Sequence, residues 1–91
     1  MTPLNDTYQI ELSPRALKDL RRMKDKRLHD RMTDAISELA NDPRPTGSLK
    51  LVGEVDQWRL RVGDWRIVYR IEDGLLVVLV VTIAPRGGVY R

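Results

Sequence analysis

The sequence predicts a small α+β domain in the order β-α-α-β-β-β, with two helices packed on one face of a mostly antiparallel four-stranded sheet. Three observations predict it. Residues 58–71 alternate between apolar and basic side chains, residues 14–40 carry apolar side chains at helical spacings, and residues 75–83 are apolar at almost every position. Alternation indicates strands with one buried face, and a short continuous apolar run suits a strand covered on both faces. Residues 1–91 are expected to form one domain.

The first strand and the two helices have recognisable boundaries. Residues 8–12 alternate and predict a strand. Ser13 is a suitable helix N-cap, and Pro14 suits the first position of a short helix. A second helix is expected at residues 26–40, and it ends at residues 41–45 because proline disfavours helix in the residue before it.

Two tight turns define the second half of the chain. Residues 46–57 are expected to be irregular, and residues 58–71 to form a hairpin around Gly63-Asp64. A two-residue loop there places Val62 opposite Trp65 and Arg61 opposite Arg66. Asp73-Gly74 predicts a second two-residue turn before a strand at residues 75–83 in the middle of the sheet. The cross-strand pairs expected across that turn are Arg70 with Val77, Val68 with Leu79, and Arg66 with Val81.

Four arginines are expected on one face of the hairpin, because side chains in a strand alternate between faces. They are Arg59, Arg61, Arg66 and Arg70. Like charges directly opposite each other oppose folding by roughly 0.2–1 kcal/mol, so this arrangement indicates an anion-binding surface. Phosphate suits the planar guanidinium group, and an apolar floor of valine and leucine strengthens each contact. The alternative is a merely solvated face, although such faces usually mix charges of both signs.

Composition restricts the chemistry. The chain has no cysteine and one histidine, which excludes thiol chemistry, histidine-pair catalysis and most zinc sites, so no metal or cofactor is expected.

The net charge is +3, and residues 15–31 hold eight Lys/Arg against three Asp. This basic helical zone is either solvated or faces an acidic partner. Neither a secretory signal nor an apolar run of ~20 residues is visible, so no membrane association and a cytoplasmic location are expected.

These parts would suffice for a metal-free ribonuclease. RNA supplies its own nucleophile, the 2′-hydroxyl, so the protein must orient that group, neutralise the developing charge and move two protons. Arginines can neutralise the charge, and a tyrosine whose pKa is lowered by nearby arginines can accept a proton. Arg86 and Tyr90 follow the last strand, but Pro85 and the two glycines interrupt the alternation, so their direction cannot be derived.

Residues 8–20, residues 58–71 and the ending Arg86-x-x-x-Tyr90-Arg91 resemble the RelE/ParE superfamily of toxins from toxin–antitoxin pairs, and in particular its RelE branch. The resemblance implies a ribosome-dependent messenger-RNA endoribonuclease that cuts in the ribosomal A site and inhibits translation. It implies Tyr90 as general base and Arg86 as phosphate stabiliser or proton donor. The implied catalytic residues are Arg61, Arg66, Arg86 and Tyr90, and the implied RNA-binding residues are Lys50, Arg59, Arg70 and Arg91.

The resemblance also implies partners. A cognate antitoxin would lay an acidic, amphipathic segment over the helices and sheet, and operator DNA would be bound only through the antitoxin. Two other functions stay open: a ParE-like toxin that inhibits DNA gyrase without cutting RNA, and a catalytically degenerate module that only binds its antitoxin. Arg86 and Tyr90 favour the RNA branch, because a gyrase inhibitor has no need of an arginine–tyrosine pair beside a basic sheet.

Overall fold

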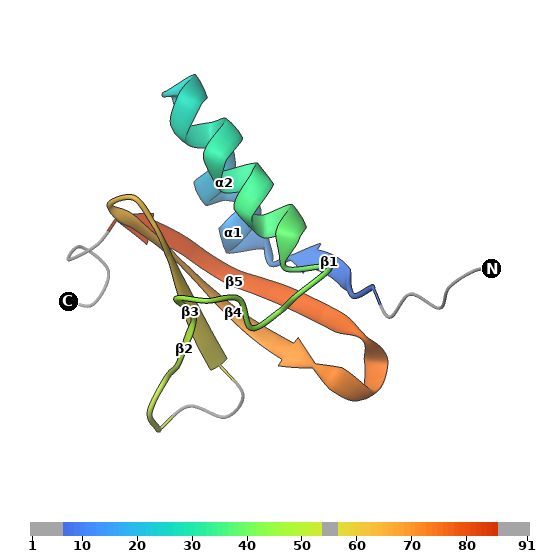
Figure 1. The fold of residues 1–91 in the computed structure, drawn as a ribbon. Coiled ribbons are helices and arrows are strands. Elements are labelled where there is room, and N and C mark those ends of the chain that lie inside the picture. Colours follow the sequence, from blue (N-terminus) through green and yellow to red (C-terminus); the bar gives the residue numbers. More distant parts are fainter. Residues whose placement is uncertain (1–6, 54–56, 86–91) are drawn as a thin grey trace.

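The computed structural model describes residues 7–53 and 57–85. A five-stranded sheet in the order β1-β5-β4-β3-β2 forms one layer, and two helices lie together over one of its faces (Figure 1). β1 runs parallel to β5, and all other pairs are antiparallel. The elements are β1 (Gln9–Leu12), α1 (Pro14–Arg21), α2 (Lys26–Glu38), β2 (Leu49–Lys50), β3 (Gln57–Val62), β4 (Trp65–Glu72), a 3-10 turn (Asp73–Leu75) and β5 (Val77–Pro85).

The predicted α+β class is confirmed, with one strand more than expected. The extra strand, β2, lies at the sheet edge within the stretch predicted to be irregular. Two residues are too few to show an alternating pattern, so the sequence carries no signal for it. Both helix starts follow their caps: the Ser13 hydroxyl accepts from the Ala16 N–H at 3.0 Å, and Asp25 caps α2 in the same way.

The β3–β4 hairpin has the predicted register. Val62 pairs with Trp65 and Arg61 with Arg66 around the two-residue loop. Gly63 has φ +62°, the left-handed conformation that the first position of a type II′ turn requires. A Cβ atom there would also lie 3.4 Å from the Arg31 guanidinium group of α2. A side chain at this position would therefore be strained by its positive φ, although its contact with Arg31 would be an ordinary one.

The predicted pairing between β4 and β5 is wrong. The connection has four residues rather than two, because the chain makes a 3-10 turn and then places Leu76 at φ +53°. This moves the register by two residues, and a bulge at Val81 moves it by one more. The observed pairs are Arg70 with Leu79, Val68 with Thr82, and Arg66 with Ala84.

Helix α1 holds the bulge in place. The Ser13 hydroxyl donates to the Val81 carbonyl oxygen at 2.7 Å, and the Asp19 carboxylate accepts from the Ile83 N–H at 3.1 Å. Backbone groups that lose their ladder partners at a bulge need others, because unpaired polar groups are costly to bury. Sequence reasoning missed the bulge because these partners lie more than sixty positions away along the chain.

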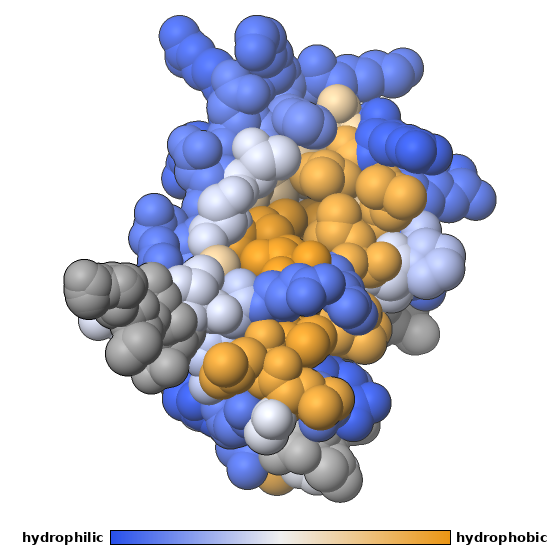
Figure 2. Space-filling model, turned by 90° about the vertical axis from the view of Figure 1, so that its right-hand side faces the viewer, coloured by the Kyte–Doolittle hydropathy of each residue, from blue (hydrophilic) through white to orange (hydrophobic). Residues whose placement is uncertain are grey.

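The core lies between the helices and the sheet, and β5 is an interior strand as predicted. Seen from the side of β1 and the β4–β5 connection, hydrophobic residues gather over the middle of the molecule, below the hydrophilic surface of the helices (Figure 2). Neither described helix is long and apolar enough to cross a membrane. The buried core residues are Ala16, Met32, Ile36, Leu39, Val62, Ile67, Tyr69, Ile71, Val78, Val80 and Ile83.

Candidate functional site

The sheet face opposite the helices carries the four predicted hairpin arginines, and we call it the arginine face. Its members are Arg59, Arg61, Arg66 and Arg70. Val68 lies among them and is only 6% exposed, although the helices cover the other face. Its neighbours are Arg59 on β3 and Thr82 on β5. The arginine side chains around it are themselves packed on the sheet, since the Nε atoms of Arg66 and Arg70 are buried.

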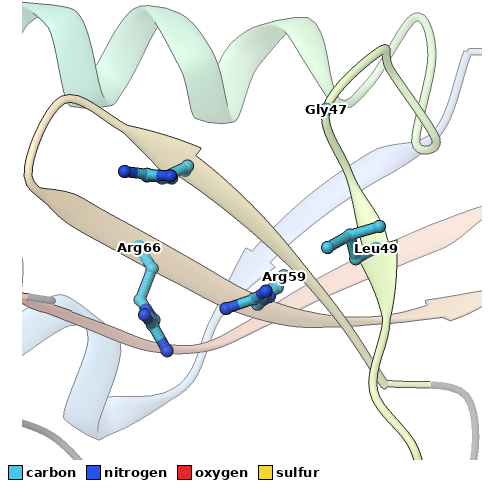
Figure 3. A pocket seen from close by; sticks show the side chains of 5 residues that line it. Gly47, Leu49, Arg59 and Arg66 are labelled. Atoms are coloured by element: carbon cyan, nitrogen blue, oxygen red, sulfur yellow. The ribbon is translucent and has the colours of Figure 1, made fainter. Parts of the chain in front are cut away.

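Three of these arginines meet at a pocket of about 120 Å³. Figure 3 shows Leu49 on β2, Arg59 on β3 and Arg66 on β4 around it, with Gly47 on the loop that leads to β2. Arg61 completes the lining. Three guanidinium groups at one small pocket make a suitable site for a phosphate group, because each offers several donors in a planar fork.

Register decides which side chains of β2 reach this pocket. Leu49 pairs with Arg59 and shares its face, whereas Lys50 pairs with Trp58, whose ring packs against the core on the other face. The structure therefore does not bring Lys50 to the arginine face. Leu49 and Gly47 were missed by sequence reasoning, because a two-residue strand gives no pattern from which its register can be read.

Arg70 is separate from the pocket. It forms an ion pair with Glu72 at 3.4 Å, and the two side chains are 41% and 42% exposed. A pair this exposed contributes little stability, but it compensates part of the Arg70 charge. Arg59, Arg61 and Arg66 are thus the members of the arginine face that the structure brings together.

The loop before β2 is anchored at several points. The buried Tyr69 hydroxyl donates to the Pro43 carbonyl oxygen at 2.8 Å. Arg44 lies over the Trp58 ring, 5.3 Å from its centroid, and forms an ion pair with Asp73 at 2.8 Å. These contacts tie the loop to β3, β4 and the β4–β5 connection. The pocket wall that the loop supplies is therefore held in a defined position.

Neither described tyrosine is suited to act as the general base. A hydrogen bond to Asp73, 2.6 Å long, raises the pKa of Tyr8, and burial raises the pKa of Tyr69. A phenol that serves as a base needs its pKa lowered instead. The predicted base and its neighbours, Tyr90, Arg86 and Arg91, lie outside the described residues, so their roles stay predictions.

Within residues 7–53 and 57–85, no group of three or more His, Cys, Asp or Glu side chains is placed to hold a metal.

Asp73 is expected to make stability depend on pH. Hydrogen bonds from Arg44 and Tyr8 lower its pKa, so the folded state favours the carboxylate. This contribution is present above the ordinary aspartate pKa and is lost as the pH falls through the lowered value. The difference in urea midpoint between the wild type and Asp73→Asn should therefore shrink below about pH 4. In an Arg44→Ala background the difference above that pH should be smaller, and a difference that grows on acidification would contradict the assignment.

Comparison with known proteins supports the resemblance seen in the sequence. The family model described as "ParE toxin of type II toxin-antitoxin system, parDE" matches residues 10–90. A chain of the archaeal RelE–RelB complex from Pyrococcus horikoshii OT3 has a TM-score of 0.78 and 25% identity, over 90% of this chain and 98% of that one. A chain of the intact Escherichia coli RelBE complex has a TM-score of 0.72 and 28% identity, over 86% and 95%.

A more distant relative shares the fold alone. The YoeB/ParE toxin from Agrobacterium tumefaciens has a TM-score of 0.74 at 19% identity, over 86% of this chain and 98% of that one. No curated protein sequence matches the chain. The family match covers nearly the whole sequence and includes the hairpin that carries the arginine face. The chain therefore belongs to the RelE/ParE superfamily, the toxins of type II toxin–antitoxin systems.

Proposed function

We propose that this toxin is a messenger-RNA endoribonuclease that acts in the ribosomal A site and inhibits translation. The observation that carries the proposal is the pocket at which Arg59, Arg61 and Arg66 meet on a sheet face that the helices leave uncovered. Such a surface suits the RNA backbone, because guanidinium groups bind phosphate oxygens in a bidentate manner.

The reaction needs no metal. The 2′-hydroxyl of the message attacks the adjacent phosphorus, a P–O bond to the 2′-oxygen forms, and the bond to the 5′-oxygen of the next nucleotide breaks. Negative charge builds on the phosphoryl oxygens, where preorganised donors stabilise it. Arg61 and Arg66 take this role in the proposal, and Arg59 holds the backbone. Val68, which pairs with Arg59 on the same face, lowers the local dielectric.

Two protons must move, and the hairpin supplies no group for the first transfer. In the proposal Tyr90 accepts the proton of the 2′-hydroxyl. Arg86 donates a hydrogen bond to the leaving 5′-oxygen but keeps its proton, since an arginine is a poor acid at its usual pKa, and the leaving oxygen takes the second proton from solvent water. Arg70 and Arg91 are proposed as further contacts to the RNA backbone.

A ParE-like toxin that inhibits DNA gyrase is the second candidate, and the description of the matching family model favours it. The similarity to the RelE complexes, at 25% and 28% identity, favours the first. The fold is common to both kinds of toxin and does not decide between them. A degenerate toxin that only binds its antitoxin would show neither activity.

We also propose a cognate antitoxin as partner, since two of the similar structures are toxin–antitoxin complexes. The basic side of α1 suits an acidic segment. Arg15, Lys18 and Arg22 surround a shallow surface hollow there, and among the described residues that line it Asp19 is the single acidic one. Operator DNA would be bound by this complex through the antitoxin.

Mapping of message 5′ ends after induction, with DNA supercoiling measured in parallel, tests the proposed function. We expect cuts at a fixed position within codons and normal supercoiling. Tyr90→Phe and Arg86→Ala should each lower cleavage by about 10²-fold or more and relieve growth arrest, while antitoxin binding is retained. Intact messages with blocked supercoiling would establish the gyrase alternative, and full toxicity of both variants would refute the catalytic assignment.

A further inference from the structure

Leu49 is an apolar side chain at the edge of a strongly basic pocket. It is 53% exposed, and it lines the pocket together with Arg59, Arg61 and Arg66. Its pairing with Arg59 directs it to the arginine face (Figure 3). A leucine in the pocket wall can lower the local dielectric, but it makes no favourable direct contact with a phosphate, because phosphate is polar on every side.

The position of Leu49 is defined by the backbone around it. Beyond β2 the Leu51 N–H donates to the Gln57 carbonyl oxygen at 2.8 Å, and before β2 the Ser48 N–H donates to the Pro45 carbonyl oxygen at 3.0 Å. Gly47 has φ +97°, and the space that a Cβ atom would take there is open. The pocket is therefore open at Gly47, which lines it together with Leu49.

We propose that Leu49 is the contact for a message nucleobase, whose neighbouring phosphate is bound by Arg59, Arg61 and Arg66. A nucleotide combines a flat face that packs on apolar side chains with a phosphate only one sugar away, which matches this juxtaposition of leucine and arginines. The inference rests on the proposed RNA-cleaving function and names a contact within the same site.

A protein helix fits this surface less well. Such a partner needs apolar anchors at helical spacing, whereas among the described residues that line this pocket Leu49 is the single one with an apolar side chain. The leucine side chain offers no hydrogen bonds that distinguish one base from another, and glycine has no side chain. Leu49 therefore contributes affinity for any base, and it does not select the codon.

The test measures binding to ribosomes programmed with a message whose A-site codon is 2′-deoxy, so that it cannot be cut. A second message carries abasic residues in that codon. Leu49→Ala should weaken binding to the intact codon by roughly three- to tenfold and should leave binding to the abasic codon unchanged. The control is Val52→Ala, since Val52 is 99% exposed on the same segment and does not line the pocket. It should bind both messages as the wild type does.

Salt dependence separates the leucine from the arginines. Leu49→Ala removes no charge and should keep the wild-type salt slope, whereas Arg61→Ala should reduce it. One contrary result is that Leu49→Ala loses as much binding to the abasic codon as to the intact one, and another is that it loses only antitoxin binding. If Arg61→Ala still weakens ribosome binding, either result would overturn the nucleobase contact and leave the proposed function standing. A wild-type toxin that binds neither programmed ribosome would overturn the proposed function as well.

Discussion

Replacing Arg61 and Arg66 together by alanine is expected to slow message cleavage by about 10³-fold or more. Loss of one preorganised donor from a developing oxyanion typically costs about 10²–10³ in rate, and these two arginines face each other across β3 and β4 at the pocket. The measurement is single-turnover cleavage on programmed ribosomes, with growth arrest after induction as the cellular counterpart.

The matched control removes two positive charges from the helical side of the molecule. Arg21 and Lys24 are both exposed and lie in and just after α1, so Arg21→Ala/Lys24→Ala should cut at the wild-type rate. The pocket variant should also stay folded, because removing opposed like charges relieves roughly 0.2–1 kcal/mol of repulsion. A fully active, folded pocket variant would show that the arginine face is only a solvated surface.

Tyr69→Ala is expected to lower the free energy of unfolding by about 3–5 kcal/mol, the range for removing a buried aromatic ring. Tyr69 is fully buried between the sheet and the helices, and its hydroxyl anchors the loop that carries the pocket wall. The free energy of unfolding of a small domain is typically about 5–15 kcal/mol, so a loss of this size is a large part of it. Urea denaturation measures it directly.

Two further variants separate packing from loop anchoring. Tyr69→Phe keeps the ring but leaves the Pro43 carbonyl oxygen without its donor, so it should cost only about 1–3 kcal/mol. Because Gly47 lies on the same loop and Leu49 follows it in β2, Tyr69→Phe should also weaken binding to programmed ribosomes. Tyr8→Ala is the control. Because Tyr8 is partly exposed at the sheet edge, this variant should lose less free energy of unfolding than Tyr69→Ala. Equal losses for Tyr8→Ala and Tyr69→Ala would refute this account of the core.

The arginine face shows how far local reasoning reaches. Arg61 and Arg66 are five residues apart, and the two-residue loop between their strands leaves one register, so their pairing follows from the sequence. The neighbouring strand shows the limit. Asp73-Gly74 has the composition of a tight turn, yet the chain continues through Leu76 and then forms a bulge whose polar groups are held by Ser13 and Asp19.

The sequence by itself determined the fold class, the helix caps, the basic hairpin and the superfamily, because each depends on periodicity, capping or motif residues close together in the chain. Only the tertiary structure decided which residues surround the pocket. It placed Leu49 with Arg59, put Lys50 on the opposite face, and paired Arg70 with Glu72. These outcomes depend on the register of a two-residue edge strand and on a loop anchored by Tyr69 and Arg44. Both are fixed by contacts between segments far apart in the sequence, and no local pattern predicts such contacts.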